Sequence, residues 1–131
     1  MKNNKEILQL AINASKNAYC KYSDFPVGAC AVFESRNEYT GCNVENSSYG
    51  LSLCAERNAI SSAIAAGEKS KLIKLAVYSS KTHLCFPCGA CRQWIYEFAK
   101  GYNTQIILQG LDNEIKIFGI NEILPYPFEI L

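Results

Sequence analysis

The feature that most constrains the fold of this chain is a regular alternation between helix-like and strand-like segments. Apolar residues recur at helical spacing from Ile7 to Ala18, and two later helix-like segments end at Gly67 and Gly101. The predicted elements are, in chain order, a helix over 4–18, strands over 27–34 and 38–44, a helix over 54–66, a strand over 72–79, a helix from 91 to about 100, strands over 104–109 and 115–118, and a helical turn over 120–124. Helices that alternate with strands after an opening hairpin favour an α/β fold, here a mixed five-stranded sheet layered between helices.

Length and charge narrow the classes of protein to which the chain can belong. Its 131 residues allow one domain, which we expect to span 1–131, and the apolar circumference of 54–66 predicts a buried central helix. Thirteen basic and twelve acidic residues give a net charge of +1, which is unlike the strongly basic balance of nucleic-acid binders. No apolar run approaches a membrane span. We therefore expect neither a nucleic acid nor a membrane as partner.

The cysteine count bears on location and chemistry. There are seven cysteines, and the chain opens on a polar stretch that continues as an amphipathic pattern rather than as a signal-peptide core. We therefore expect a cytoplasmic protein whose thiols are free or bound to metal rather than paired in disulfides. Four of the cysteines are interpreted as small apolar core residues: Cys20, Cys30, Cys42 and Cys85.

Two cysteine-bearing segments carry the clearest chemical signal. Pro87-Cys88-Gly89-Ala90-Cys91-Arg92 places two thiols at C-x-x-C spacing where a loop enters a predicted helix, and Cys54-Ala55-Glu56-Arg57 opens another helix. Together they supply three thiolates, which leave the fourth position of a tetrahedral zinc ion open for water. Zinc lowers the pKa of a bound water to about 7, so this arrangement is typical of a catalytic site. We predict one zinc ion per subunit, held by Cys54, Cys88 and Cys91.

Charged neighbours of the cysteines suggest further roles. Glu56 lies two residues after Cys54, where it can reach a water on the metal, and we predict that it is the general acid and base. Three thiolates on Zn²⁺ leave a formal charge of −1, which two helix N-termini and a cation would offset. Arg57 is the first candidate for that cation and Arg92 the second.

Other interpretations of these residues stay open at this stage. Cys85-Phe86-Pro87-Cys88 is a second C-x-x-C, so Cys85 could be a redox thiol or an alternative ligand, although Ile95 stands where an iron–sulfur pattern requires a cysteine. A zinc-binding structural module is the alternative from another functional class, but such a site normally has four protein ligands. His83, the one histidine, fits no ligand spacing.

At this point the motifs resemble those of the small homotetrameric cytidine deaminases over essentially the whole chain. Besides the two cysteine segments, the matching stretches are Tyr22-Ser23-Asp24-Phe25-Pro26-Val27-Gly28-Ala29, Asn43-Val44-Glu45-Asn46-Ser47-Ser48-Tyr49-Gly50 and Leu124-Pro125-Tyr126-Pro127-Phe128. The resemblance implies zinc-dependent hydrolysis of free cytidine and 2′-deoxycytidine to uridine and 2′-deoxyuridine with release of ammonia, in pyrimidine salvage. It also implies a homotetramer with shared active sites.

The resemblance assigns roles residue by residue. It implies Cys54, Cys88 and Cys91 as zinc ligands and Glu56 as the proton shuttle. The other roles that it implies are ribose hydrogen bonds from Asn43 and Glu45, base contacts by Phe25 and Ala55, entry of Phe128 into a neighbouring subunit's site, and subunit contacts by Tyr22 and Tyr49.

The chain departs from the family pattern at two neighbouring positions. Phe86 stands where many relatives have a small polar residue, and Cys85 is unusual beside it. Phe86 could alter the base pocket or only the packing of the loop. A different substrate for the same chemistry, a cytosine-containing antibiotic or a base in nucleic acid, is the alternative function. The complete Asn-Val-Glu-Asn stretch favours a nucleoside, and the basic cluster Lys69, Lys71 and Lys74 is interpreted as a solvated turn rather than a strand-binding surface.

Overall fold

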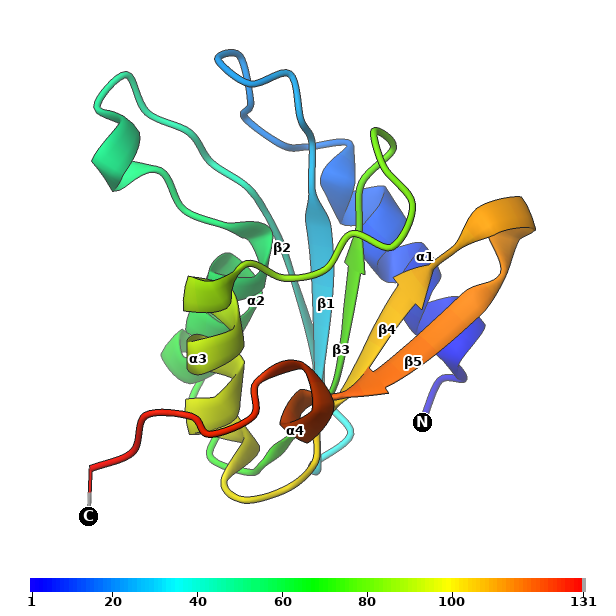
Figure 1. Ribbon diagram of the computed structural model, residues 1–131, viewed down its shortest axis with the longest axis vertical. Helices are drawn as coiled ribbons and strands as arrows, with labels where there is room; N and C mark the ends of the chain where they lie inside the picture. Colours follow the sequence, from blue (N-terminus) through cyan, green and yellow to red (C-terminus); the bar gives the residue numbers. More distant parts are fainter. Residues whose placement is uncertain (131) are drawn as a thin grey trace.

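The computed structural model describes residues 1–130 and consists of one mixed sheet with helices on both faces (Figure 1). Five strands, in the order β2-β1-β3-β4-β5, form the sheet; β3 and β4 are parallel, and the other neighbours are antiparallel. The α/β class and the five-stranded sheet predicted from the sequence are confirmed. The elements are α1 (Asn4–Ser15), β1 (Gly28–Phe33), β2 (Glu38–Cys42), η1 (Tyr49–Leu51), α2 (Ala55–Ala65), β3 (Leu72–Tyr78), α3 (Gly89–Ala99), β4 (Gln105–Gln109), η2 (Leu111–Asn113), β5 (Ile115–Gly119) and α4 (Ile120–Ile123).

The core has two parts, one on each face of the sheet. Helix α1 buries Ile7, Leu8 and Ala11 against one face, while α2 and α3 bury Ile60 and Ile95 against the other. The N-terminus of α1 is closed by a capping box, in which the Asn3 side chain accepts from the backbone of Glu6 and the Glu6 carboxylate accepts from that of Asn3. Among the described residues, none of the helices has the length and apolar character needed to cross a membrane.

Three boundaries differ from the sequence-based prediction by two or more residues, and tertiary pairing explains the first two. Helix α1 ends at Ser15 rather than at 18, since the chain must extend for Tyr19 to pair with Val44 in an isolated bridge. Strand β2 ends at Cys42 rather than at 44, because Val44 is paired with Tyr19 and Leu53 instead. Helix α3 begins at Gly89, two residues before its predicted start.

The prediction that 54–66 forms a buried central helix is wrong for a single chain. Helix α2 packs on β1 and β2, at one edge of the sheet, so only one of its faces is covered. On the other face Ile64 is 46% exposed. The apolar residues of this helix therefore exceed what one chain can bury.

Helix α2 lies unusually close to β2 because Gly41 has no side chain. A Cβ atom at Gly41 would lie 2.4 Å from the backbone nitrogen of Ala59 and 2.7 Å from the carbonyl oxygen of Ala55. The Asn58 side chain completes the contact, since its Nδ2 donates to the carbonyl of Cys42 at 2.8 Å. A glycine inside a strand marks such a close approach, and here it fixes the helix that carries Glu56.

Candidate metal centre and active site

Helices α2 and α3 both begin at the end of the sheet where β2 and β3 finish, and each begins at a cysteine (Figure 1). Cys54 is the N-cap of α2 and Cys88 the N-cap of α3, and neither side chain caps its own helix through a hydrogen bond. Cys91 is buried in the first turn of α3. The two local segments found in the sequence therefore meet in space, with their thiols free to face one another.

The three sulfur atoms of Cys54, Cys88 and Cys91 lie within 4.8 Å of one another. Sulfurs bound tetrahedrally to zinc at about 2.3 Å are about 3.8 Å apart. The three sulfur atoms would therefore need to move only slightly closer together to bind the ion. Three soft thiolate donors fit zinc, and a fourth position is left for a small molecule. Cys85 is not part of this group, and burial raises the pKa of its thiol to about 11.

Arg57, the first candidate for the compensating cation, contacts a thiol of this group. Its Nη2 donates to the sulfur of Cys54 at 3.2 Å, and its buried Nε has no partner within residues 1–130. Hydrogen bonds from Cys91 and from Arg57 lower the pKa of Cys54 to about 5, whereas the hydrogen bond to Cys54, together with burial, raises that of Cys91. The thiolate form, in which cysteine binds a metal, is thus favoured at Cys54, and the unpartnered Nε–H of Arg57 beside the cluster fits additional negative charge.

Glu56 lies in the first turn of α2 and is only 4% exposed. Burial raises the pKa of its carboxyl group to about 7, and the negative charge of Cys54 contributes in the same direction. A carboxyl group with a pKa near 7 exchanges a proton readily at neutral pH, which is the property required of a general acid and base.

Arg92, the second candidate for the compensating cation, is turned elsewhere. Its Nε donates to the carbonyl of Pro87 at 2.7 Å and its Nη1 to the carbonyl of Ile123 at 2.8 Å. Phe86 lies beside Arg92 and packs on Phe118, with ring centroids 4.8 Å apart. The unusual Phe86 therefore contributes to packing of the loop on β5.

Asn43 and Glu45, the expected ribose contacts, also hold the segment before β1. The Asn43 amide accepts from the backbone N–H of Val27 at 2.9 Å and donates to the carbonyl of Phe25 at 2.8 Å. The Glu45 carboxylate accepts from the backbone of Tyr22 at 3.0 Å and from both the backbone and the hydroxyl of Ser23. The Ser23 hydroxyl bond and these backbone bonds lower the pKa of Glu45, so it is ionised at neutral pH.

The aromatic residues expected at subunit contacts are exposed. Tyr22 and Tyr49 meet edge to face, with centroids 6.0 Å apart, and are 43% and 75% exposed. Phe128 is 70% exposed, and its backbone is held to α3 by the Gln93 amide, which accepts at 3.3 Å and donates at 2.9 Å. Phe25 is 37% exposed, and Ala55 is buried directly after Cys54. Sequence reasoning missed Gln93 and Gly41; the glycine inside a predicted strand was the available signal for the second.

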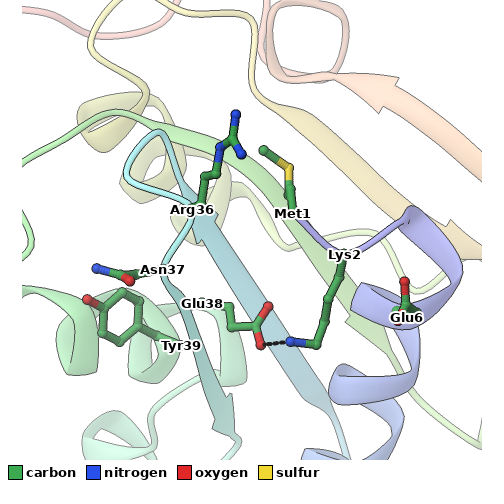
Figure 2. Close-up of a pocket in the computed structure, with 7 residues that line it drawn as sticks. All are labelled: Met1, Lys2, Glu6, Arg36, Asn37, Glu38 and Tyr39. Carbon is green, nitrogen blue, oxygen red and sulfur yellow. Dashed lines mark hydrogen bonds and ion pairs between the residues drawn. The ribbon is translucent and has the colours of Figure 1, made fainter.

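A cavity of about 780 Å³ lies at the opposite end of β1 and β2 (Figure 2). Figure 2 shows the Lys2 ammonium paired with the Glu38 carboxylate, and Arg36 and Tyr39 also line the cavity. The Lys2 nitrogen lies 2.5 Å from the Glu38 oxygen. The cavity lies at Glu38, where β2 begins, whereas the thiols lie at the end of the sheet where β2 finishes. The two sites are therefore separated by the length of the β1–β2 hairpin. Its volume alone does not make it the site, because the groups with metal-binding and proton-transfer properties lie at the other end.

The fold and the site define a class: an α/β protein with a cluster of three thiols, able to hold a metal ion, at two helix N-termini and a buried glutamate beside it. Comparison with known proteins identifies the family. The "Cytidine and deoxycytidylate deaminase zinc-binding region" matches residues 1–109. A cytidine deaminase from Sporosarcina psychrophila is 41% identical over 115 residues, which cover 88% of this chain and 83% of that protein.

Solved structures agree with this result. The cytidine deaminase from Burkholderia pseudomallei superposes with a TM-score of 0.90 at 36% identity, over 97% of this chain and 100% of that one. The enzyme from Mycobacterium tuberculosis superposes with a TM-score of 0.86 at 33% identity, over 99% and 100%. The chain belongs to the zinc-dependent cytidine and deoxycytidylate deaminase family.

Proposed function

We propose that this protein hydrolyses free cytidine and 2′-deoxycytidine to the corresponding uridines, with release of ammonia, in pyrimidine salvage. The observation that carries the proposal is the meeting of three thiols within 4.8 Å of one another beside Glu56, whose pKa is raised to about 7. The relatives named cytidine deaminase support cytidine as the substrate. The deoxy substrate and the salvage role rest on the family resemblance.

Cys54, Cys88 and Cys91 would hold the zinc ion, and Arg57 would offset their charge. When bound, zinc supplies a Lewis acid and lowers the pKa of a water ligand to about 7. Glu56 accepts the proton of the attacking water and delivers it to N3 of the cytosine ring, which makes C4 electrophilic. After the water oxygen has added to C4, Glu56 takes the remaining proton from that oxygen and delivers it to the exocyclic amino group, so that the C4 carbonyl forms, the C4–N bond breaks and ammonia leaves.

Asn43 and Glu45 would bind the ribose while they hold the segment that carries Phe25. Both retain hydrogen-bonding capacity: the Asn43 amide has a second N–H, and a carboxylate offers about four acceptor positions, of which Glu45 uses three. An amide donor beside a carboxylate acceptor suits vicinal hydroxyl groups. Phe25 and Ala55 would border the base.

A homotetramer with shared active sites is part of the proposal. Its support is the exposure of Tyr22, Tyr49 and Phe128 and the half-exposed Ile64 on the outer face of α2. Phe128 would enter the site of a neighbouring subunit. A cytoplasmic location remains a prediction from the sequence.

The direct test is turnover by zinc-loaded protein, followed by the change in ultraviolet absorbance as cytidine becomes uridine. We expect cytidine and 2′-deoxycytidine both to be deaminated and cytosine within nucleic acid to react far more slowly. A zinc-loaded protein without turnover on either nucleoside would contradict the proposal.

The ligand assignment has its own test in a matched pair of cysteines. Cys88→Ala is expected to lower the zinc content measured by metal analysis, whereas Cys85→Ala, which changes a thiol in the same loop, is expected to keep it. Full zinc content in Cys88→Ala, with its loss in the double variant, would instead assign Cys85 as a ligand.

A further inference from the structure

The loop that leads to Cys88 is fastened by a residue that follows the metal-binding motif. Arg92, in the first turns of α3, folds back so that Nε donates to the carbonyl of Pro87 at 2.7 Å. Pro87 is buried and directly precedes Cys88. The planar guanidinium of Arg92 therefore fixes the backbone carbonyl directly before Cys88, the proposed zinc ligand.

The same guanidinium reaches a second part of the chain. Nη1 donates to the carbonyl of Ile123 at 2.8 Å, and Ile123 ends α4. The carbonyl groups of a last helical turn lack partners within the helix, so Arg92 supplies one. One rigid fork thus joins the loop of Cys88 to the C-terminal segment, a geometry that an ammonium group cannot reproduce.

Phe86 also holds the loop before Cys88 against the sheet. Its ring lies 5.7 Å from the Arg92 guanidinium carbon and packs on Phe118 of β5. Farther upstream, the Leu84 N–H donates to the carbonyl of Gln109, also at the β4–β5 side of the sheet. The loop is therefore anchored on β4, β5 and α4, while its thiol faces α2.

Arg57 and Arg92, the two arginines next to the cysteine motifs, therefore bind different groups. Arg57 donates to a sulfur, whereas Arg92 donates to two carbonyl oxygens. We propose that Arg92 is a positioning residue that keeps Cys88 at ligand distance by tying its loop to the end of α4, so that retention of zinc depends on this tie. The inference rests on the proposed metal site.

The test is the rate at which zinc-loaded protein releases Zn²⁺ to an excess of a coloured chelator. Arg92→Gln removes the charge and the guanidinium group that bridges the two carbonyls, and Arg92→Lys keeps the charge but cannot bridge both carbonyls. Both variants are expected to release zinc about tenfold faster, the lower end of the effect found for groups that orient metal ligands. Phe86→Leu is expected to give a smaller increase in the same direction.

Arg36→Gln is the matched control, because Arg36 lies on the exposed turn between β1 and β2. Its zinc release is expected to stay within twofold of wild type. Wild-type release from Arg92→Lys together with fast release from Arg92→Gln would show a charge effect and overturn the proposal. Wild-type release from both would overturn it as well.

A spectroscopic readout separates positioning from general loosening of the fold. Cobalt-substituted protein shows thiolate-to-cobalt charge transfer, and at equal cobalt content this band is expected to weaken in Arg92→Lys because Cys88 no longer stays at ligand distance. An unchanged band would overturn the proposal. If Arg92→Gln does not fold, the rates of zinc release from Arg92→Lys and Phe86→Leu test the proposal instead. A wild-type protein that binds no zinc would instead contradict the proposed function.

Discussion

The two ends of helix α2 each present a glutamate, and the two carboxyl groups have opposite properties. Glu56, in the first turn, is almost fully buried, and burial raises its pKa to about 7. Glu68 lies just beyond the other end, and although burial alone would raise its pKa, hydrogen bonds from Ser35, Ser70 and Tyr39 lower it to about 2. The same residue type thus has a carboxyl group that exchanges its proton near neutral pH at one end of the helix and one that is ionised at neutral pH at the other.

The difference lies in the donors around each group. The Glu68 carboxylate accepts from the hydroxyl groups of Ser35 and Ser70 at 2.7 Å and from that of Tyr39 at 3.1 Å, which ties the β1–β2 hairpin to the connection before β3. At the thiol end, by contrast, Arg57 keeps an unpartnered N–H within the described chain. Satisfied polar groups stabilise the fold, and groups with unused capacity are available for a metal and a substrate.

The largest expected effect comes from removal of the proton carrier. Glu56→Gln is expected to lower the turnover number about 10²- to 10⁴-fold, as for loss of a general acid and base. Zinc content and nucleoside binding should persist, which metal analysis and titration calorimetry can check. The free energy of unfolding should not fall, since a neutral amide is less costly to bury than a carboxylate. Turnover near the wild-type value would contradict the role of Glu56.

Gly41→Ala is expected to have the next largest effect, this time on stability. The new methyl group would meet backbone atoms of α2 at 2.4–2.7 Å, so strand and helix must separate, at a cost of about 2–3 kcal/mol in the free energy of unfolding. Gly50→Ala is the matched control, because a Cβ there meets nothing within 4 Å. Equal denaturation midpoints for the two variants would show that close packing at Gly41 does not position α2.

Glu68→Gln is expected to cost about 1 kcal/mol, because an amide replaces an ionised acceptor on the exposed side of the molecule. The pKa of Glu68 is lowered from 4.5 to about 2 on folding, so its contribution is complete above about pH 5 and is lost as the pH falls from 4.5 toward 2. Urea unfolding of both proteins between pH 3 and pH 7 should therefore show the difference shrinking toward low pH. A difference independent of pH would assign the effect to packing.

The smallest effect is expected from the ion pair in the cavity of Figure 2. Lys2→Met removes the contact with Glu38, which lies at the surface, with the two side chains 44% and 28% exposed. Exposed pairs contribute little, and salt screens them. We expect a shift of the melting temperature near the limit of detection, absent at high salt. A large shift would show that this end of the sheet depends on charge rather than on the Glu68 network.

Local spacing made a large part of this structure predictable. The order of helices and strands follows from residues within a few positions of one another. The same local patterns place Cys54 at the start of one helix and the pair Cys88 and Cys91 at the start of another. Element ends were less predictable: α1 stops at Ser15 because Tyr19 pairs with Val44, a partner 25 positions away that no local pattern indicates.

By itself, the sequence determined that the chain forms an α/β sheet, and it predicted Cys54, Glu56, Cys88 and Cys91 as the groups that bind a metal and move a proton. Only the tertiary structure decided which environment each received: Arg57 rather than Arg92 at the thiolate, burial for Glu56 and five donors for Glu68. The physical reason is that residue type and helical position are local, whereas burial, hydrogen-bond partners and therefore pKa depend on segments that meet only when the sheet has formed.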